Sequence, residues 1–367
     1  MKIVIAPDSF KGSATSPEIA QWIADGIHSV IPDCETVMIA VGDGGEGSLD
    51  AILSSGFTSH SVEVTGPLGN TVTARFAMKA ETAFIEMAQA SGLSHLPDGR
   101  KDALAATSFG TGQLILAALD MGAKKIILAI GGTATTDAGA GALQALGVRL
   151  RDALGNEIAQ GGAALIDCAS VDTTGLDPRL SITEFILASD VTNPLLGEFG
   201  AARVFSPQKG ATPDQVAILE KSLAHFASLV GGEYASLPGA GAAGGFGYMA
   251  YAFLGAQAHS GINLILDLIN FDEQIVGADY VITGEGRFDS QSVKGKAPWG
   301  ILKRAEEFAI PTFLVCGDAD NQHGTKYREI FTLTSLEPDV EFCMKNPAPL
   351  VTQLGAQIGT LIQKPKF

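Results

Sequence analysis

Six short runs of β-branched and other apolar residues recur along this chain, and each leads directly into a loop rich in glycine or proline. The runs are residues 2–6 (KIVIA), 35–41 (ETVMIAV), 124–130 (KKIILAI), 184–189 (EFILAS), 280–284 (YVITG) and 312–317 (TFLVCG). Their continuous apolarity, without alternation, is typical of strands that are buried on both faces of a parallel sheet. We therefore expect parallel β-structure whose strands are joined through helices.

Amphipathic helical segments lie between these runs. Residues 16–30 place apolar side chains on one stripe of a helix, and Pro17 suits the first helical turn. Residues 212–230 begin with Thr212 and Gln215, which match a capping box. The alternation of strands and helices predicts an α/β fold.

Residues 61–90 have a different pattern. Apolar and polar residues alternate on both sides of the turn GPLGN, which predicts antiparallel strands. At 367 residues the chain exceeds the length that one hydrophobic core usually serves, so we expect two domains. We predict a discontinuous first domain from residues 1–60 and 280–367, and an inserted second α/β domain from residues 61–279. A boundary near residue 100 is the alternative.

The composition describes a well-buried globular protein with a strong negative charge. Hydrophobic residues make up 46% of the chain, and 40 acids against 24 bases leave a net charge of −16. This charge argues against nucleic acid or an anionic membrane as a partner, and any anion site needs a local group of Lys and Arg. Four scattered cysteines and the lack of a long apolar run predict a reduced, cytoplasmic protein without a membrane span.

The loops after the six runs combine glycine or proline with acids, amides and hydroxyls. Ligands of open α/β sheets bind beyond the carboxyl ends of the strands, so these loops suggest a shared site. Carboxylates there suit Mg²⁺, which prefers oxygen ligands, although aspartate also caps helices and forms turns at such positions. The acids concerned are Asp8, Asp43, Glu46, Asp137, Asp190, Glu285 and Asp289.

Two glycine-rich segments and a set of basic residues bear on phosphate binding. Residues 131–141 (GGTATTDAGAG) run from a strand into a helix, where backbone N–H groups bind phosphate in other proteins, or glycines form a tight turn. Residues 238–247 contain G-x-G-x-x-G, but no strand precedes it, which argues against a dinucleotide fold. Basic residues beside glycine and hydroxyl or amide groups suit a phosphate or carboxylate clamp: Lys11, Lys209, Arg287, Lys294 and Lys296.

From these residues alone, phosphoryl transfer is the leading reaction class, in a cleft that suits Mg²⁺ and phosphate. The acceptor is not specified by this reasoning. A nicotinamide-dependent oxidoreductase acting on sugar acids and a non-catalytic small-acid sensor are the alternatives from other classes. The sequence has no H-E-x-x-H and no G-x-S-x-G motif, so catalytic zinc and serine hydrolase chemistry are not expected.

At the same residues the chain resembles the type 1 glycerate kinase family. Matching segments follow one another along nearly the whole chain, including APDSFKGS (6–13), DGGEGS (43–48), GGTATTDAGAG (131–141), PGAGAAGGFG (238–247) and VITGEGRFDSQSVKGK (281–296). The resemblance implies ATP-dependent phosphorylation of D-glycerate with Mg²⁺, giving 2-phosphoglycerate as in bacterial members of this type. A 3-phosphoglycerate product, or another short acid such as tartronate or hydroxypyruvate as the acceptor, is the alternative.

The resemblance also implies an architecture and a set of partners. It implies a flavodoxin-like parallel-sheet domain and a second, mixed α/β domain of restriction-enzyme-like type, with the active site between them. We expect small-molecule substrates, no nucleic acid and no membrane, and we allow for a homodimer.

The resemblance and the strand-exit positions together give hypothetical roles to individual residues. The residues expected to bind D-glycerate are Asp8, Ser9, Lys11, Asn193 and Arg287, with Lys11 and Arg287 on its carboxylate. Those expected to bind ATP are Gly131, Gly132, Thr133, Asp137, Lys209, Ser292, Lys294 and Lys296. Glu285 and Asp289 are expected to hold Mg²⁺. Asp190 or Asp43 is expected to accept the proton of the acceptor hydroxyl, and completes the catalytic set with Lys11 and Arg287.

One loop departs from the family pattern, which usually reads like GGSATNDGGAG. Here Thr133, Thr136 and Ala138 stand in place of the Ser, the Asn and the second Gly. Thr133 keeps a hydroxyl and Thr136 loses an amide, while Asp137 is retained. We expect Ala138 to exclude a positive φ at its position.

Overall fold

The computed structural model describes residues 1–363 other than 43, 46, 291 and 321–325. The chain forms two compact units, which we call unit 1 (residues 1–43, 50–55 and 262–367) and unit 2 (residues 44–49 and 56–261). The sequence predicts changes of domain after residues 60 and 279, whereas the units change after residues 55 and 261. Compactness alone does not show that each unit folds by itself, so the division into two domains stays a prediction.

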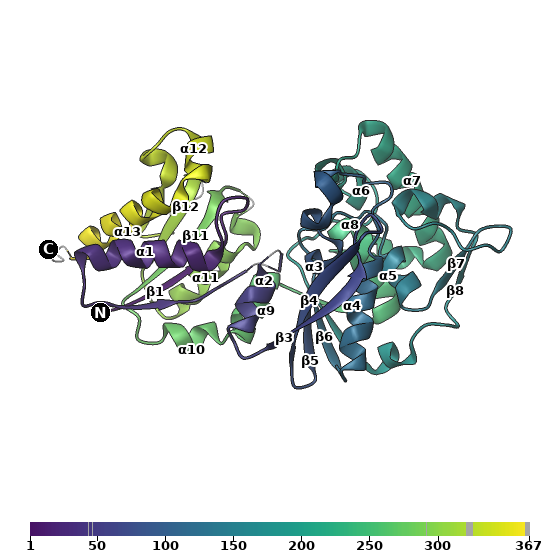
Figure 1. Ribbon diagram of the computed structural model, residues 1–367, viewed down its shortest axis with the longest axis horizontal. Helices are drawn as coiled ribbons and strands as arrows, with labels where there is room; N and C mark the ends of the chain where they lie inside the picture. Colours follow the sequence, from purple (N-terminus) through teal and green to yellow (C-terminus); the bar gives the residue numbers. More distant parts are fainter. Residues whose placement is uncertain (43, 46, 291, 321–325, 364–367) are drawn as a thin grey trace. The chain divides into compact units, whose positions relative to one another are not determined.

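Unit 1 is built around a five-stranded parallel sheet with the order β13–β12–β11–β1–β2 (Figure 1). Its strands are β1 (Lys2–Pro7), β2 (Glu35–Met38), β11 (Tyr280–Phe288), β12 (Thr312–Ala319) and β13 (Glu329–Thr332). The chain builds the sheet from β1 to β2 in one direction and then from β11 onward in the other. The reversal between β1 and β11 is a topological switch point, where ligands of such sheets bind.

Two layers of helices cover the sheet of unit 1. The helices of this unit are α1 (Ser16–Val30), α10 (Phe271–Ile275), α11 (Ala297–Glu307), α12 (Val340–Lys345) and α13 (Pro347–Gln363). Residues from α1 and α13 share one hydrophobic cluster with Phe313 and Val315 of β12, whereas Leu302 of α11 clusters with Leu314 and Cys316. Successive residues of a strand point to opposite faces, so α11 packs on the face opposite α1 and α13.

The two predicted helix starts are confirmed. Thr15 caps α1, a capping box joins Thr15 and Glu18, and Pro17 lies in the first turn. In unit 2, Thr212 and Gln215 form the predicted capping box at the start of α7 (Pro213–Val230). Helix α2 (Ser48–Leu53) and helix α9 (Gly261–Leu268) contain residues of both units.

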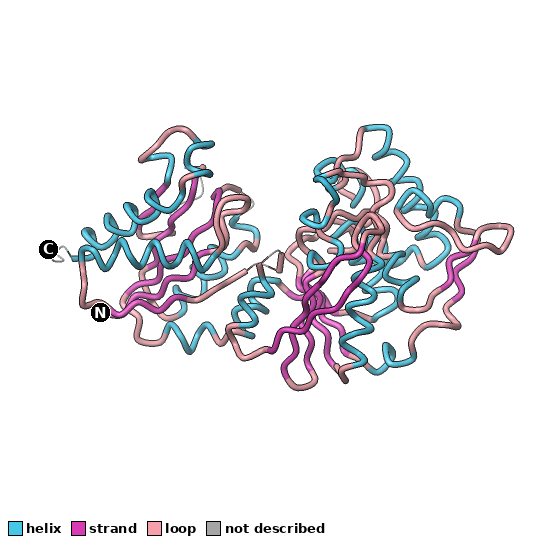
Figure 2. Tube along the Cα trace, viewed as in Figure 1, coloured by secondary structure: helices cyan, strands magenta, loops and turns pink. Residues whose placement is uncertain are grey.

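Unit 2 contains a six-stranded mixed sheet with the order β10–β9–β6–β5–β4–β3. Strands β10, β9, β6 and β5 are parallel, while β5–β4 and β4–β3 pair antiparallel. The strands are β3 (Thr58–Thr65), β4 (Thr71–Lys79), β5 (Thr82–Glu86), β6 (Lys125–Ala129), β9 (Glu184–Ala188) and β10 (Gln257–His259), with a separate antiparallel pair β7 (Arg149–Arg151) and β8 (Ser170–Asp172). The hairpin of β3 and β4 confirms the predicted antiparallel strands (Figure 2).

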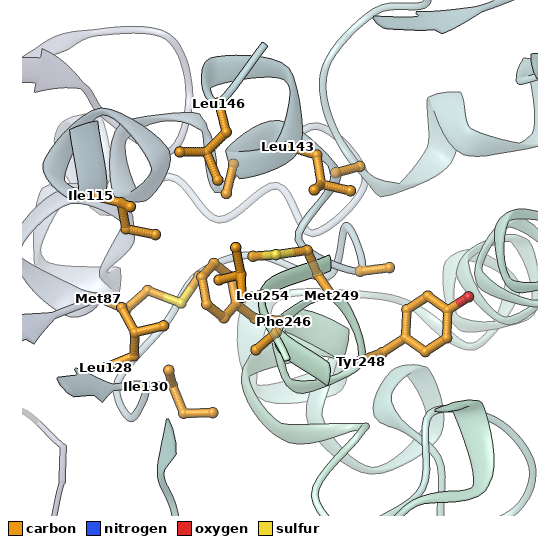
Figure 3. Packing of buried hydrophobic residues seen from close by; sticks show 14 of the residues in the cluster. Met87, Ile115, Leu128, Ile130, Leu143, Leu146, Phe246, Tyr248, Met249 and Leu254 are labelled. Atoms are coloured by element: carbon orange, nitrogen blue, oxygen red, sulfur yellow. The ribbon is translucent and has the colours of Figure 1, made fainter. Parts of the chain in front are cut away.

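The core of unit 2 is a large cluster of buried apolar residues. Its remaining helices are α3 (Ala88–Ser91), α4 (Phe109–Asp120), α5 (Ala140–Ala145), α6 (Ala201–Phe205) and α8 (Ala242–Leu254). Phe246 and Met249 of α8 cluster with Met87, with Leu128 of β6 and with Leu143 of α5 (Figure 3). This packing joins α8 to the elements on either side of the glycine-rich segment 131–139.

All six predicted strands are present, and they are divided between the two sheets. β1, β2, β11 and β12 belong to unit 1, and β6 and β9 belong to unit 2. The prediction of burial on both faces is wrong for β2, where Glu35 and Met38 are exposed, because β2 is an edge strand with a partner on one side only. Within the described residues, no helix is long and apolar enough to cross a membrane.

Candidate active site

A cavity of about 390 Å³ lies in unit 1 at the carboxyl ends of β1, β11 and β12. This position is the topological switch point of the parallel sheet. The cavity has three acidic and three basic side chains in its lining: Asp8, Glu285, Asp318, Lys11, Arg287 and Lys296. Five of these six come from the residues that the sequence predicted for the site, and Ser9 lines the same cavity.

The loop after β1 brings its polar groups to the cavity by local hydrogen bonds. The Asp8 N–H donates to the Gly284 carbonyl oxygen at 2.8 Å, which continues the pairing of β1 with β11. The Asp8 carboxylate is 4% exposed and accepts from the Ser9 N–H at 2.8 Å. Gly12, at φ +77°, allows the turn that places Lys11 in the lining. The predicted substrate residues of this loop therefore lie together.

A buried ion pair lies at the end of β11. Lys296 Nζ is 3.1 Å from Glu285 Oε2, and Glu285 is only 4% exposed. Burial raises the pKa of Glu285, while the Ser292 hydroxyl and the Lys296 ammonium oppose that rise, and the charge of Asp289 adds to it. The ammonium therefore stabilises a carboxylate that would otherwise be poorly solvated.

Arg287 is exposed and has no ion pair within the described residues. An unpaired guanidinium beside a cavity is suited to bind a carboxylate or a phosphate through two hydrogen bonds. The Ser292 hydroxyl accepts from the Asp289 N–H at 3.0 Å, so it fixes the loop that follows Arg287. Lys294 ends the short helix 292–294, and its side chain, like residues 43 and 46, lies outside the described part of the chain.

In unit 2, the carboxylate of Asp137 is fully buried and occupies the start of α5. Its Oδ2 accepts from the N–H and the Oγ of Ser108, both at 2.8 Å, and from the Gly141 N–H at 3.2 Å, while Oδ1 accepts from the Gly139 N–H at 3.2 Å. Burial raises the pKa of Asp137, and these hydrogen bonds oppose the rise. Two of the backbone N–H groups that the sequence suggested for phosphate thus donate to the protein's own carboxylate.

Lys209 is buried behind the same glycine-rich loop. It ends the 3₁₀ helix 207–209, is 3% exposed, and its Nζ donates to the Thr135 carbonyl oxygen and, at 3.4 Å, to Thr133 Oγ1. Burial lowers the pKa of Lys209 to about 7, and the charge of Asp137 opposes this shift. Lys209, Thr133 and Asp137, which the sequence assigned to ATP, therefore lie near one another, and the hydrogen bonds of Lys209 are with the loop itself.

The expectation that Ala138 excludes a positive φ is wrong, since its φ is +52°. The Ala138 N–H donates to the Gly244 carbonyl oxygen at 3.1 Å, and this hydrogen bond holds the strained conformation. Residues 243–245 also have positive φ, and a Cβ on Gly244 would lie 2.0 Å from the Thr135 carbonyl oxygen. The glycines of the 238–247 motif therefore serve close backbone packing against the 131–139 loop, and a 3₁₀ helix rather than a strand precedes them.

The remaining predicted residues of unit 2 lie after β9. Asp190 Oδ2 accepts from the Gly261 N–H at 3.1 Å, and Asn193 Nδ2 donates to the Phe199 carbonyl oxygen at 2.8 Å. Both side chains are partly exposed. Gly131 and Gly132, which the sequence assigned to ATP, are the more accessible part of their loop, whereas residues 133–141 are buried.

Sequence reasoning missed several residues of the cavity. Asp318 belongs to the loop GDADNQHG, which follows a predicted strand and has the same polar composition as the other such loops, but it was not among the residues predicted for the site. Val340 and Met344 of α12 also line the cavity, and nothing in their sequence marks them, because α12 is short and lies far along the chain from β1. Among the described residues, no group of three or more His, Cys, Asp or Glu side chains could hold a metal ion alone.

The fold and the cavity together define an α/β protein with a cavity of acidic and basic side chains at the switch point of a parallel sheet. A family model described as the glycerate kinase family matches residues 3–363. The glycerate 2-kinase of Escherichia coli K12 is 46% identical over 336 residues, which cover 89% of this chain and 88% of the relative. The glycerate kinase of Bacillus subtilis 168 is 45% identical over 347 residues, which cover 92% and 91%.

A solved structure described as glycerate kinase 2 from Salmonella typhimurium LT2 agrees with this fold. Its TM-score is 0.82 at 42% identity, and the match covers 99% of this chain and 98% of that chain. The chain therefore belongs to the glycerate kinase family, and it is a phosphotransferase. A kinase of this family takes its phosphoryl group from ATP.

Proposed function

We propose that this protein transfers the γ-phosphoryl group of ATP to the 2-hydroxyl of D-glycerate, giving 2-phosphoglycerate and ADP. The observation that carries the proposal is the convergence of Lys11, Arg287 and Lys296 on one cavity of a chain whose net charge is −16. A protein of this charge repels small anions at long range, so a local group of cations indicates that an anion is bound there. The 46% sequence identity with the E. coli glycerate 2-kinase supports D-glycerate as the acceptor and its 2-hydroxyl as the position phosphorylated.

The cations of the cavity are proposed to divide the anionic groups between them. Lys11 and Arg287 would hold the carboxylate of D-glycerate, with Asp8 and Ser9 contacting its hydroxyls, because Arg287 is exposed and has no ion pair within the described residues. Lys296 would face the phosphates while Glu285 orients it. Phosphoryl transfer depends chiefly on such positioning and on charge neutralisation.

The predicted residues of unit 2 are also proposed to bind the substrates. Gly131, Gly132 and Thr133 are the part of the glycine-rich loop that we assign to the phosphates, because the Gly139 and Gly141 amides donate to Asp137. Asp137 and Lys209 would support this loop from behind. Asp190 or Asp43 would accept the proton of the acceptor hydroxyl, and Asn193 would contact D-glycerate. Lys294 and Ser292 would act on the phosphate side.

Mg²⁺ is proposed to accompany ATP, and the acidic residues at the end of β11 fit this role. The charge of Asp289 raises the pKa of Glu285, so the two carboxylates are close enough to repel each other. A cation between or beside them would relieve that repulsion. With no three-residue metal cluster among the described residues, the ion would depend on phosphate oxygens and water for its other ligands, as Mg²⁺ commonly does. When bound, it would neutralise charge on the phosphates.

The reduced state of the four cysteines supports a cytoplasmic location for this proposed activity. Cys34, Cys168, Cys316 and Cys343 are all buried and free. Disulfides are uncommon in reducing compartments.

The proposal is tested by measuring ADP release from ATP and Mg²⁺ with D-glycerate, L-glycerate, tartronate and hydroxypyruvate in turn. D-glycerate should give the highest kcat/KM. Arg287→Met should lower kcat/KM for D-glycerate at least 100-fold, about 2.7 kcal/mol, because it removes a charge-assisted contact. Arg203→Met, an exposed arginine of α6, is the matched control and should stay within about twofold of the wild type.

Three outcomes would count against this proposal. If folded protein releases no ADP above its background with any of these acids, a short hydroxy-acid is not the acceptor. If NADH fluorescence instead rises on titration with the protein, the nicotinamide alternative gains support. Equal loss of activity in Arg287→Met and Arg203→Met would remove Arg287 from the site.

A further inference from the structure

The cavity of unit 1 has an apolar part that a three-carbon acid does not explain. Besides the charged residues, its lining contains Phe10, Leu333, Val340, Cys343 and Met344. Every carbon of glycerate carries oxygen, so it has little apolar surface to place against such a wall. At about 390 Å³ the cavity is also within the usual range for sites of larger metabolites and cofactors.

The apolar wall has a buried floor and an accessible rim. Phe10, Leu333 and Cys343 are at most 3% exposed and form the floor. Val340 and Met344 are 53% and 47% exposed, and they are four residues apart on α12, which places them on the same face of the helix. Their exposure beside a cavity leaves apolar surface that a ligand can cover.

The apolar wall is joined to the charged part of the lining by a direct contact. Ser13 Oγ donates to the Met344 carbonyl oxygen at 2.6 Å, so the loop that carries Lys11 is joined to the end of α12. Asp339 caps α12 by accepting from the N–H groups of Glu341 and Phe342 at 2.9 and 3.2 Å, which fixes the start of the helix. The cavity therefore combines charged and apolar side chains in one lining, and the Ser13 hydrogen bond holds the two parts together.

We propose that the apolar part of this cavity's lining, formed by Phe10, Leu333, Val340, Cys343 and Met344, binds the base and ribose of the nucleotide, with its phosphates directed toward Lys296. A nucleoside phosphate combines a flat, largely apolar ring with an anionic chain, and this matches the two parts of the lining. The inference rests on the proposed function for the identity of the nucleotide. It adds the location of the nucleoside, which places ATP largely on unit 1.

The test compares ADP with tripolyphosphate, which has the phosphate chain without base or ribose. Calorimetry should show that the double variant Val340→Asn/Met344→Asn binds ADP at least 10-fold more weakly than the wild type, about 1.4 kcal/mol. Its affinity for tripolyphosphate should stay within twofold. Phe342→Asn is the matched control, because Phe342 is 47% exposed on the same helix and does not line the cavity.

Three results would overturn the inference. They are an unchanged ADP affinity in the double variant, an equal weakening for ADP and tripolyphosphate, and an equal effect of Phe342→Asn. Because these are binding measurements without turnover, they are independent of the acceptor. A protein that binds ADP as described but does not phosphorylate D-glycerate would contradict the proposed function and leave the nucleoside site standing.

Discussion

Replacing Lys209 with methionine should stabilise this protein at pH 7, even though the change removes two hydrogen bonds. Lys209 is 3% exposed, and burial lowers its pKa to about 7. In the unfolded chain a lysine has a pKa of about 10.4. Keeping this side chain buried at neutral pH therefore requires either the loss of its proton or the burial of its charge, and both oppose folding.

The size of the effect follows from the difference between the two pKa values, which corresponds to roughly 5 kcal/mol at most and to roughly 4 kcal/mol at pH 7. The unfolded state binds more protons than the folded state between the folded and unfolded pKa values. The penalty is therefore complete below about pH 7 and disappears as the pH rises toward 10.4. Losing the contacts to Thr133 and the Thr135 carbonyl oxygen costs about 1–3 kcal/mol, so the net gain should be about 2 kcal/mol at pH 7.

Urea unfolding of the wild type and Lys209→Met at pH 7 and pH 10 checks this reasoning. The difference between the two proteins cancels the other groups that titrate in this range. The methionine variant should be more stable at pH 7, and its advantage should vanish or reverse at pH 10, where only the lost hydrogen bonds remain. Lys221→Met, an exposed lysine of α7, should show no such pH-dependent difference. A less stable Lys209→Met whose deficit is the same at both pH values would refute the argument.

Three other predictions concern the loop and the ion pair. Gly244→Ala should lower the free energy of unfolding by about 3 kcal/mol or more, because its Cβ would lie 2.0 Å from the Thr135 carbonyl oxygen. The control Gly255→Ala, also at positive φ but with open space around it, should lower it by about 1 kcal/mol. Equal losses of the two variants in urea unfolding would argue against this packing. Asp137→Asn should lose about 2–4 kcal/mol in the same assay, since an amide nitrogen cannot accept from Ser108 and Gly141, and a neutral result would contradict the capping role. Lys296→Met should raise the pKa of Glu285 further, because it removes the ammonium beside the buried carboxylate. If activity needs the ionised carboxylate, the acidic limb of the pH profile of kcat/KM should move to higher pH. An unchanged acidic limb would exclude Glu285 and Lys296 from the site.

Much of the fold could be predicted because its signals are local. The run YVITG predicted a strand at 280–284, and β11 extends it to Phe288 because β12 continues to pair with it through Ala319. The turn GPLGN fixed the hairpin between Thr65 and Thr71 for the same reason. The exposed edge of β2 was not predictable, because apolarity of a short run does not reveal how many neighbours a strand has.

The candidate site was predictable where its residues follow directly from strands, and less so where distant segments meet. Asp8, Glu285 and Arg287 could be placed in one cavity because β1 and β11 are neighbours in a parallel sheet. The internal role of Asp137 depends on Ser108, 29 residues away, and the positive φ of Ala138 depends on a hydrogen bond to Gly244. No local sequence pattern predicts such contacts, and none predicts that Val340 and Met344 of α12 line the cavity.

Phosphorus NMR of a mixture of the protein with ATP, Mg²⁺ and D-glycerate reports both products of the proposed reaction at once. We predict the resonances of ADP and 2-phosphoglycerate, appearing together and in equal amounts. The 3-phosphoglycerate resonance in its place would contradict the proposed hydroxyl. ADP with only inorganic phosphate, or no change in ATP, would contradict D-glycerate as the acceptor.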